Sequence, residues 1–171
     1  MSVNIRLALL EDIARIIEVE LEAGEVFKTL GFPDPPEEGY HLSEQVLRAG
    51  IIEERLWVAI ADKDEIVGFV LAGSVDDNAH LFEIDVIPGY SRQGIGQQLI
   101  RQVVNWARDK GYYFLTLTTF RDVPWNGLFY ARIGFEELEP QQMGTTLAQI
   151  LAEEKENNLA DWSRCAMQLR L

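Results

Sequence analysis

Residues 84–100 read IDVIPGYSRQGIGQQLI, and this stretch predicts a strand that turns directly into a helix. Before Pro88, Phe82, Ile84 and Val86 alternate with Glu83 and Asp85, so one face of this strand is expected to be apolar and the other carboxylated. From Gly94 to Lys110 apolar residues recur at helical spacing, and Gly111 can take the left-handed cap. The first amides of a helix have no partner within it, so residues 93–98 are predicted to bind an anion.

The charge distribution favours the same site. The chain has 28 acidic and 15 basic residues, for a formal charge of −13, yet residues 86–108 contain no Asp or Glu. Arg92, Arg101 and Arg108 lie within that acid-free stretch. A strongly negative surface repels phosphate backbones and anionic lipids, so we expect neither nucleic acid nor a membrane as a partner.

The flanking segments alternate between strand and helix patterns. Strands are expected at 3–7, 56–61, 66–74, 81–87, 113–120 and 164–171, and helices at 10–21, 43–47, 94–110, 126–133 and 145–157. The turn at 62–65 is expected to join two of these strands in a hairpin. Leu21 falls on the apolar face of the first helix, and Ser43 can cap the second. Three prolines in residues 31–39 predict one long loop. The order predicts a mixed α/β fold in a single domain, residues 1–171, because neither a repeat nor a long linker divides it.

The composition also narrows the class of protein. The longest apolar run, 66–73, is far shorter than the roughly 20 residues that cross a bilayer, and Glu11 and Asp12 do not fit a signal peptide. One cysteine, Cys165, and two histidines leave no pattern for structural zinc. We therefore expect a cytoplasmic, metal-free protein. The sequence leaves the oligomeric state open, a homodimer included.

Two glycines in a strand-to-helix turn also have a plain structural explanation, which is a tight turn. A dinucleotide-binding motif would need a third glycine where Leu99 stands, and a phosphate-binding Gly-Lys-Ser/Thr sequence is absent. Neither nucleotide motif fits this turn.

The stretch 84–100 instead resembles motif A of the GNAT superfamily of N-acetyltransferases, with Ser91 where Arg or Gln is usual and Arg92 beside it. Residues 126–135, NGLFYARIGF, resemble the family's motif B, and 120–126, FRDVPWN, resemble a bacterial subgroup. The resemblance covers about residues 3 to 136. It implies a central mixed sheet, splayed at the cofactor site and flanked by helices.

The resemblance further implies an acetyl-CoA site. Backbone of Ile84, Asp85 and Val86 would pair with the pantetheine arm. The pyrophosphate would lie on the turn made of Ser91, Arg92, Gln93, Gly94, Ile95, Gly96, Gln97 and Gln98. Asn126, Phe129 and Tyr130 complete the expected cofactor contacts, although Asn126 can equally serve as a helix N-cap.

Acetyl transfer to an amine needs a base, an oxyanion donor and an acid for the departing thiolate. We expect Tyr130, at the tyrosine position of motif B, to be the acid. The alternative is that Tyr130 is a core aromatic residue packed beside Phe129. We expect Glu83 to be the base, and the alternative is that it lies on an ordinary solvated strand face. His80 is the second candidate for the base, and the alternative is a histidine at the end of a loop with no catalytic role. The Val86 amide is the oxyanion donor, and Asp85 is expected to orient the substrate.

Acidic residues near the expected acceptor site are consistent with a cationic amine. They are Glu18, Glu22, Glu25, Asp34, Glu37 and Glu38, which can equally form a solvated face. We expect the acceptor to be a small-molecule primary amine. A CoA-binding sensor without turnover and a protein N-terminal acetyltransferase remain alternatives.

Overall fold

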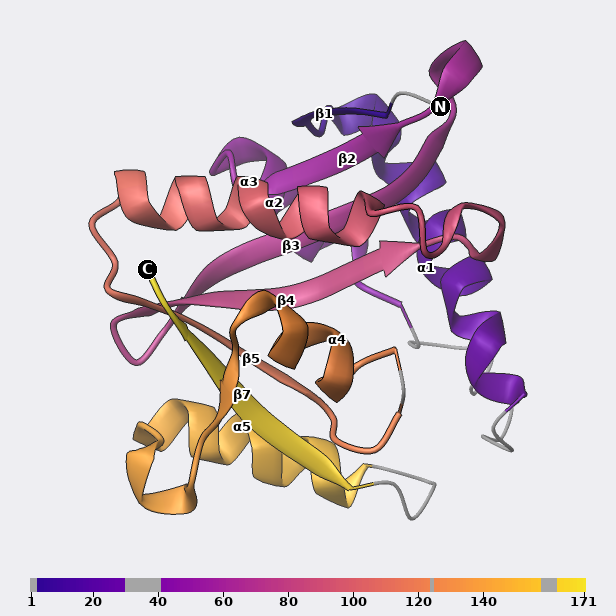
Figure 1. The fold of residues 1–171 in the computed structure, drawn as a ribbon. Helices are drawn as coiled ribbons and strands as arrows, with labels where there is room; N and C mark the ends of the chain where they lie inside the picture. Colours follow the sequence, from indigo (N-terminus) through magenta and orange to yellow (C-terminus); the bar gives the residue numbers. More distant parts are fainter. Residues whose placement is uncertain (1–2, 30–40, 124, 158–162) are drawn as a thin grey trace. The chain divides into compact units, whose positions relative to one another are not determined.

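The computed structural model describes residues 3–29, 41–123, 125–157 and 163–171 (Figure 1). The strands found there are β1 (Asn4–Leu7), β2 (Leu56–Ile60), β3 (Ile66–Val75), β4 (Asn78–Val86), β5 (Phe114–Phe120), β6 (Glu136–Glu137) and β7 (Arg164–Arg170), and the helices are α1 (Ile13–Lys28), α2 (Glu44–Ile52), α3 (Ile95–Asp109), α4 (Gly127–Ile133) and α5 (Thr145–Glu156). The hydrogen-bonded strand order is β1-β2-β3-β4-β5-β7-β6. This mixed sheet with flanking helices confirms the predicted fold class.

The chain divides into two compact units. Unit 1 comprises Met1–Ala72 and Glu83–Asn105, and unit 2 comprises Gly73–Phe82 and Trp106–Leu171. Three elements, β3, β4 and α3, run from one unit into the other. We keep the single domain over residues 1–171 as a proposal.

In unit 1, β2 pairs antiparallel with both β1 and β3, which confirms the predicted hairpin around residues 62–65. A Cβ atom on Gly50 of α2 would lie 2.7 Å from Leu71 Cδ1, and one on Gly68 would lie 3.5 Å from Leu99 Cδ1 of α3. Positions 68 and 71 face opposite sides of β3 because side chains alternate along a strand. Helices α2 and α3 therefore cover opposite faces of β3.

In unit 2, β7 lies between β5 and β6 and is antiparallel to both. Leu147 and Leu151 of α5 pack in one apolar cluster with Ala166 of β7. A Cβ on Gly134, which caps α4, would lie 3.4 Å from Leu169 Cδ1 on the same strand. Positions 166 and 169 face opposite sides, so α4 and α5 lie on opposite faces of β7.

Strand β4 begins three residues earlier than the sequence pattern predicts. Asp76 and Asp77, with φ of 49° and 62°, form the tight turn that joins β3 to β4, and such turns require positive φ at both central residues. The Asp76 carboxylate also accepts hydrogen bonds from Thr146 N at 3.0 Å and Leu147 N at 2.8 Å. The turn thereby caps α5, and these bonds lower the pKa of Asp76.

Two predicted faces are wrong in part. Phe82, which the pattern places on the apolar face of its strand, is 44% exposed, whereas Ala79, His80 and Leu81 are all buried. In the first helix, α1 begins at Ile13 after a 3-10 turn, and Leu21 is 45% exposed. The buried side chains of α1 are Ile13, Ile16, Val19 and Ala23. None of the described helices is long and apolar enough to span a membrane.

Candidate functional site

The predicted anion site forms an exposed turn at the start of α3. Arg92 and Gly94 have φ of 60° and 79°, so the backbone alternates into the left-handed region, a conformation that turns successive amides toward one side. The first helical hydrogen bond runs from Gln98 N to Gly94 O at 3.1 Å. The amides that precede Gln98 are therefore oriented out of the helix end. Because the amide of Gln98 donates within the helix, the expected anion contact depends chiefly on the amides before it, and the role of Gln98 stays a prediction.

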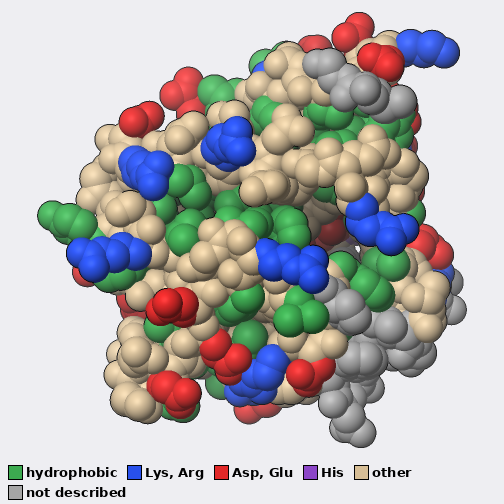
Figure 2. All heavy atoms as spheres, in the orientation of Figure 1, with side chains coloured by type: hydrophobic (Ala, Val, Ile, Leu, Met, Phe, Trp, Pro, Cys, Tyr) green, Lys and Arg blue, Asp and Glu red, His purple; other side chains and the backbone are tan. Residues whose placement is uncertain are grey.

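Side chains leave the outer surface of this turn accessible. Ser91 Oγ donates to Ile87 O at 3.4 Å, and Gln93 Nε2 donates to Gly89 O at 3.3 Å, so both side chains fold back on the preceding turn. Arg92 is exposed. Figure 2 shows basic side chains over the part of the surface that α3 forms. The turn has the charge and the donors that a diphosphate requires.

The backbone before the turn is held by a close approach of β3 to β4. A Cβ on Gly68 would lie 2.7 Å from Asp85 O, which is too close for any residue other than glycine unless the backbone moves. Ile87 N donates to Val67 O at 3.0 Å just beyond it. On the other side of β4, the ladder with β5 consists of Ala79 with Leu115 and His80 with Thr116. The β5-facing edge of β4 after His80 lies outside this ladder.

Three carboxylates interact within unit 1: Glu20 of α1, and Glu83 and Asp85 of β4. Burial raises the pKa of Asp85 well above its usual range, and the charges of Glu83 and Glu20 raise it further. Burial also raises the pKa of Glu20, although Leu42 N donates to both of its carboxylate oxygens, at 3.1 and 2.9 Å. Asp85 therefore retains a proton to a higher pH than an ordinary carboxyl group.

Glu20 is a site residue that the sequence analysis missed. It occupies the helical position between Ile16 and Ala23 on the buried face of α1, so an acid within an apolar stripe was the available signal. The acids that were singled out on α1 are instead neutralised locally: Arg15 pairs with Glu18 and Glu22, and Lys28 pairs with Glu25. Asp34, Glu37 and Glu38 lie outside the described residues.

His80 is a buried residue of β4, not a loop-end residue, and it belongs to unit 2. Its Nδ1 lies 2.8 Å from Thr116 Oγ1, and that hydroxyl donates to Ala79 O at 3.2 Å. Since the hydroxyl has one proton, it accepts from His80 Nδ1–H, which indicates the Nδ1-protonated tautomer. Burial lowers the pKa of His80 to about 4, so the ring is neutral at physiological pH.

The motif B residues lie on and beside α4 in unit 2. Tyr130 is buried, and its ring makes edge contacts with Phe129 and Phe135 at centroid distances of 5.2 and 5.7 Å. Asn126 stands at the N-cap position of α4 but makes no capping hydrogen bond with its side chain. The capping alternative for the Asn126 amide group is therefore wrong.

The predicted site residues are thus divided between the units. Unit 1 contains the turn at 91–98 and the carboxylates Glu83 and Asp85, whereas unit 2 contains His80, Asn126 and Tyr130. The described parts of the chain bring together no group of three or more His, Cys, Asp or Glu side chains suited to a metal ion.

Comparison with solved structures places this fold in a known class. A GNAT-family acetyltransferase from Staphylococcus aureus superposes with a TM-score of 0.75 at 16% identity, covering 99% of both chains. The PaiA N-acetyltransferase from Thermoplasma acidophilum, solved in complex with coenzyme A, gives a TM-score of 0.67 at 18% identity and covers all of both chains. The folds are therefore those of GNAT acetyltransferases.

Sequence comparison identifies the family itself. The acetyltransferase (GNAT) family model matches residues 19–135. The chain belongs to this family. It is also 30% identical, over 87 residues, to the ribosomal protein bS18-alanine N-acetyltransferase of Haemophilus influenzae, a match covering 51% of this chain and 59% of that relative.

The buried histidine predicts a specific pH dependence of stability. The folded state lowers the pKa of His80 from about 6.5 to about 4, so the stabilising effect of its neutral form is complete above pH 6.5 and is lost as the pH falls toward 4. Between pH 7 and pH 4.5, the free energy of unfolding in urea should fall by about 2 kcal/mol less in His80→Gln than in the parent protein. An equal loss in both proteins, or a His80 ring that titrates near pH 6.5 by NMR, would contradict the assignment.

Proposed function

We propose that this chain is an acetyl-CoA-dependent N-acetyltransferase that acetylates a primary amine. The observation that carries the proposal is the exposed, acid-free turn at the start of α3, in which Arg92 and Gly94 adopt left-handed conformations before the free helical amides. Family membership supports the same activity. We also keep a cytoplasmic location as part of this proposal.

The cofactor contacts follow from the turn and from β4. The pyrophosphate of acetyl-CoA would bind the amides of Gln93 to Gln97, with Ser91 and Arg92 at the rim. The pantetheine arm would pair with backbone of Ile84, Asp85 and Val86 on the strand edge that lies beyond the β4–β5 ladder. The coenzyme A complex of the Thermoplasma relative supports this choice of ligand.

Glu83 is the base in this proposal, because an ammonium group must lose a proton before its nitrogen can attack a carbonyl carbon. Asp85, whose pKa is raised by burial and by its acidic neighbours, would keep its proton to a higher pH than an ordinary carboxyl group and in that form donate a hydrogen bond to the acceptor or to Glu83. The Val86 amide would stabilise the developing oxyanion. His80 is the weaker alternative, because its ring is buried and its Nδ1–H is already donated to Thr116.

Tyr130 is the acid, and its hydroxyl group donates a proton to the coenzyme A thiolate as the thiolate leaves. A phenol's ordinary pKa, near 10, is close enough to that of a thiol for efficient transfer. Its ring is fixed between Phe129 and Phe135, which limits the positions of the hydroxyl group. Asn126, whose side chain is free of a capping role, and Phe129 are the remaining cofactor contacts on α4.

Two acceptor classes remain under this proposal. A small-molecule primary amine suits the three neighbouring carboxylates Glu20, Glu83 and Asp85. The likeness to a bS18-alanine N-acetyltransferase favours the N-terminal amine of a protein. Acetylation of a panel of polyamines and amino compounds, run beside peptides with free alanine N-termini, separates the two. Binding of acetyl-CoA without transfer to any amine would instead indicate a CoA sensor.

Gly96→Asp should weaken acetyl-CoA binding at least about 100-fold, because it places a carboxylate against the pyrophosphate at the helix end. Titration calorimetry with acetyl-CoA measures the loss. Gly89→Asp is the matched control, since it adds the same side chain in the preceding 3-10 turn, where a Cβ meets open space. Equal affinities of Gly96→Asp and the parent protein would refute the phosphate assignment.

Tyr130→Phe should lower kcat about 100-fold with little change in KM for acetyl-CoA, because it removes the proton donor and keeps the ring. Steady-state kinetics with a thiol-detecting reagent measures both. Tyr113→Phe, at a tyrosine that is 81% exposed, should behave as the parent protein. Unaltered turnover would assign Tyr130 to packing alone.

Glu83→Gln should lower kcat/KM about 100-fold at neutral pH and recover as the pH approaches the pKa of the amine, since free amine then needs no base. The measurement is a pH profile of kcat/KM, with the exposed acid variant Glu11→Gln as control. A deficit that is constant across pH, or a pH-rescued defect in His80→Ala, would overturn the choice of base.

A further inference from the structure

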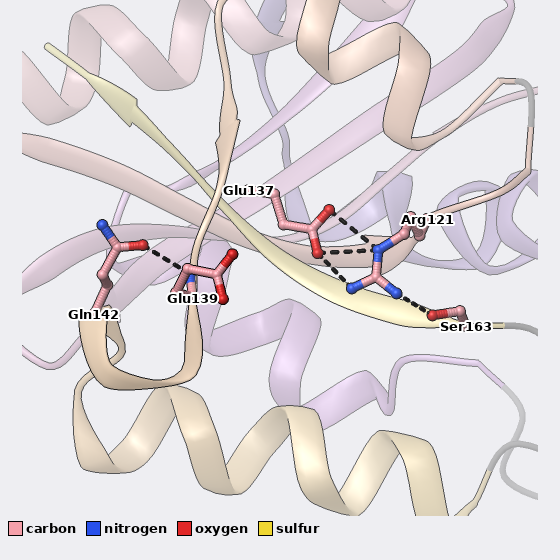
Figure 3. Close-up of polar contacts among 5 residues, drawn as sticks. All are labelled: Arg121, Glu137, Glu139, Gln142 and Ser163. Carbon is pink, nitrogen blue, oxygen red and sulfur yellow. Dashed lines mark hydrogen bonds and ion pairs between the residues drawn. The ribbon is translucent and has the colours of Figure 1, made fainter.

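An arginine at the end of β5 connects three strands on the α4 side of unit 2 (Figure 3). Arg121 Nε donates to both carboxylate oxygens of Glu137, at 2.9 and 3.1 Å, Nη2 donates to Glu137 as well, and Nη1 donates to Ser163 Oγ. Arg121 N also donates to Ser163 O at 2.8 Å. We call Arg121, Glu137 and Ser163 the Arg121 clasp.

The clasp lies on the same face of the sheet as α4. Glu137 is the direct register partner of Met167, and Leu169, which contacts the C-cap of α4, is two residues further along the strand. Side chains two apart on a strand share a face. Figure 3 shows the carboxylate of Glu137 directed at the guanidinium group of Arg121, whereas the carboxylate of Glu139 takes no part in the clasp.

Helix α4 rests directly on the backbone of Arg121. A Cβ on Gly127, its first residue, would lie 2.6 Å from Arg121 O. At its other end, Phe135 N donates to Tyr130 O at 3.1 Å, and β6 begins at the next residue. The ion pair of Arg121 with Glu137 therefore joins the two ends of the segment that contains α4.

We propose that the Arg121 clasp is a positioning device that holds α4, and with it the Tyr130 hydroxyl group, in the orientation needed for proton transfer; this inference rests on the proposed role of Tyr130. A helix of seven residues has little stability of its own, so its orientation depends on its attachments. Both charged side chains are more than 40% exposed, and exposed pairs contribute little to global stability. The pair instead restricts the motion of the segment that contains α4, because it joins the two ends of that segment.

A purely stabilising ion pair and a positioning pair give different kinetic results. Loss of a stabilising pair lowers the melting temperature and the amount of active enzyme but leaves kcat per folded molecule unchanged. Loss of a positioning pair lowers kcat while KM for acetyl-CoA stays the same, because a small displacement of the acid affects proton transfer much more than binding.

The experiment compares Glu137→Gln and Arg121→Gln with the parent protein and with the matched control Glu139→Gln, an acid two residues further along that is outside the clasp. Glu137→Gln and Arg121→Gln should each lower kcat about tenfold at unchanged KM for acetyl-CoA. The charge-swapped Arg121→Glu/Glu137→Arg protein should recover most of the activity, and Glu139→Gln should match the parent protein. Circular dichroism melting reports the folded fraction of each variant.

A second background separates this proposal from the one it rests on. In Tyr130→Phe, Glu137→Gln should cause no further loss of kcat, because there is no hydroxyl group left to position. If Tyr130→Phe by itself leaves kcat unchanged, the acid assignment fails and the role of the clasp fails with it. If Tyr130→Phe lowers kcat but Glu137→Gln does not, or lowers it equally in both backgrounds, the clasp alone is wrong.

Discussion

The register between β4 and β5 ends at His80 and Thr116, and the edge of β4 proposed to bind the cofactor begins where that pairing stops. Up to this point β4 is a strand of unit 2 with a buried, neutral imidazole. The hydroxyl group of Thr116 accepts from His80 Nδ1 and donates to Ala79 O. A charged imidazole would be costly to bury there, so burial holds the pKa of His80 at about 4. From Glu83 onward, β4 belongs to unit 1 and carries the half-buried Glu83 and Asp85. One strand thus carries a buried, neutral imidazole and then the two carboxylates of the proposed site.

The acidic residues of this protein differ in their surroundings from one element to the next. Acids on α1 are paired with Arg15 and Lys28 of the same helix, and such pairs cancel much of the field that those acids would exert. Glu20 and Asp85 are different, because burial raises the pKa of each carboxyl and like charges raise that of Asp85 further. The start of α3 has no acid and has Arg92 exposed beside its free amides. The polyanionic cofactor and the cationic acceptor that we propose would therefore be attracted to different parts of unit 1.

The motif B helix illustrates how much of a site depends on tertiary attachments. Gly127 lets α4 approach the Arg121 carbonyl, and Gly134 ends the helix in a left-handed conformation at φ of 110°. The ring of Tyr130, on the same helix, makes edge contacts with Phe129 and Phe135. Isolated, such a short segment would not stay helical, because nucleation costs more than one or two turns recover. Its orientation is a property of unit 2 as a whole.

The sequence by itself determined the elements whose patterns are local: the hairpin of β2 and β3, the long helix α3 with the acid-free turn before it, the Ser43 cap of α2, and the order of α4, α5 and β7. Periodicity and capping depend on neighbours within a turn or two, so residues 84–100 and 126–135 were enough. Only the tertiary structure decided that Glu20 interacts with Asp85, that His80 is neutral and buried, that Phe82 is exposed and that Arg121 reaches Glu137. These outcomes depend on which distant segments pack together and how far each is removed from water. Alternation along a single strand carries no information about either.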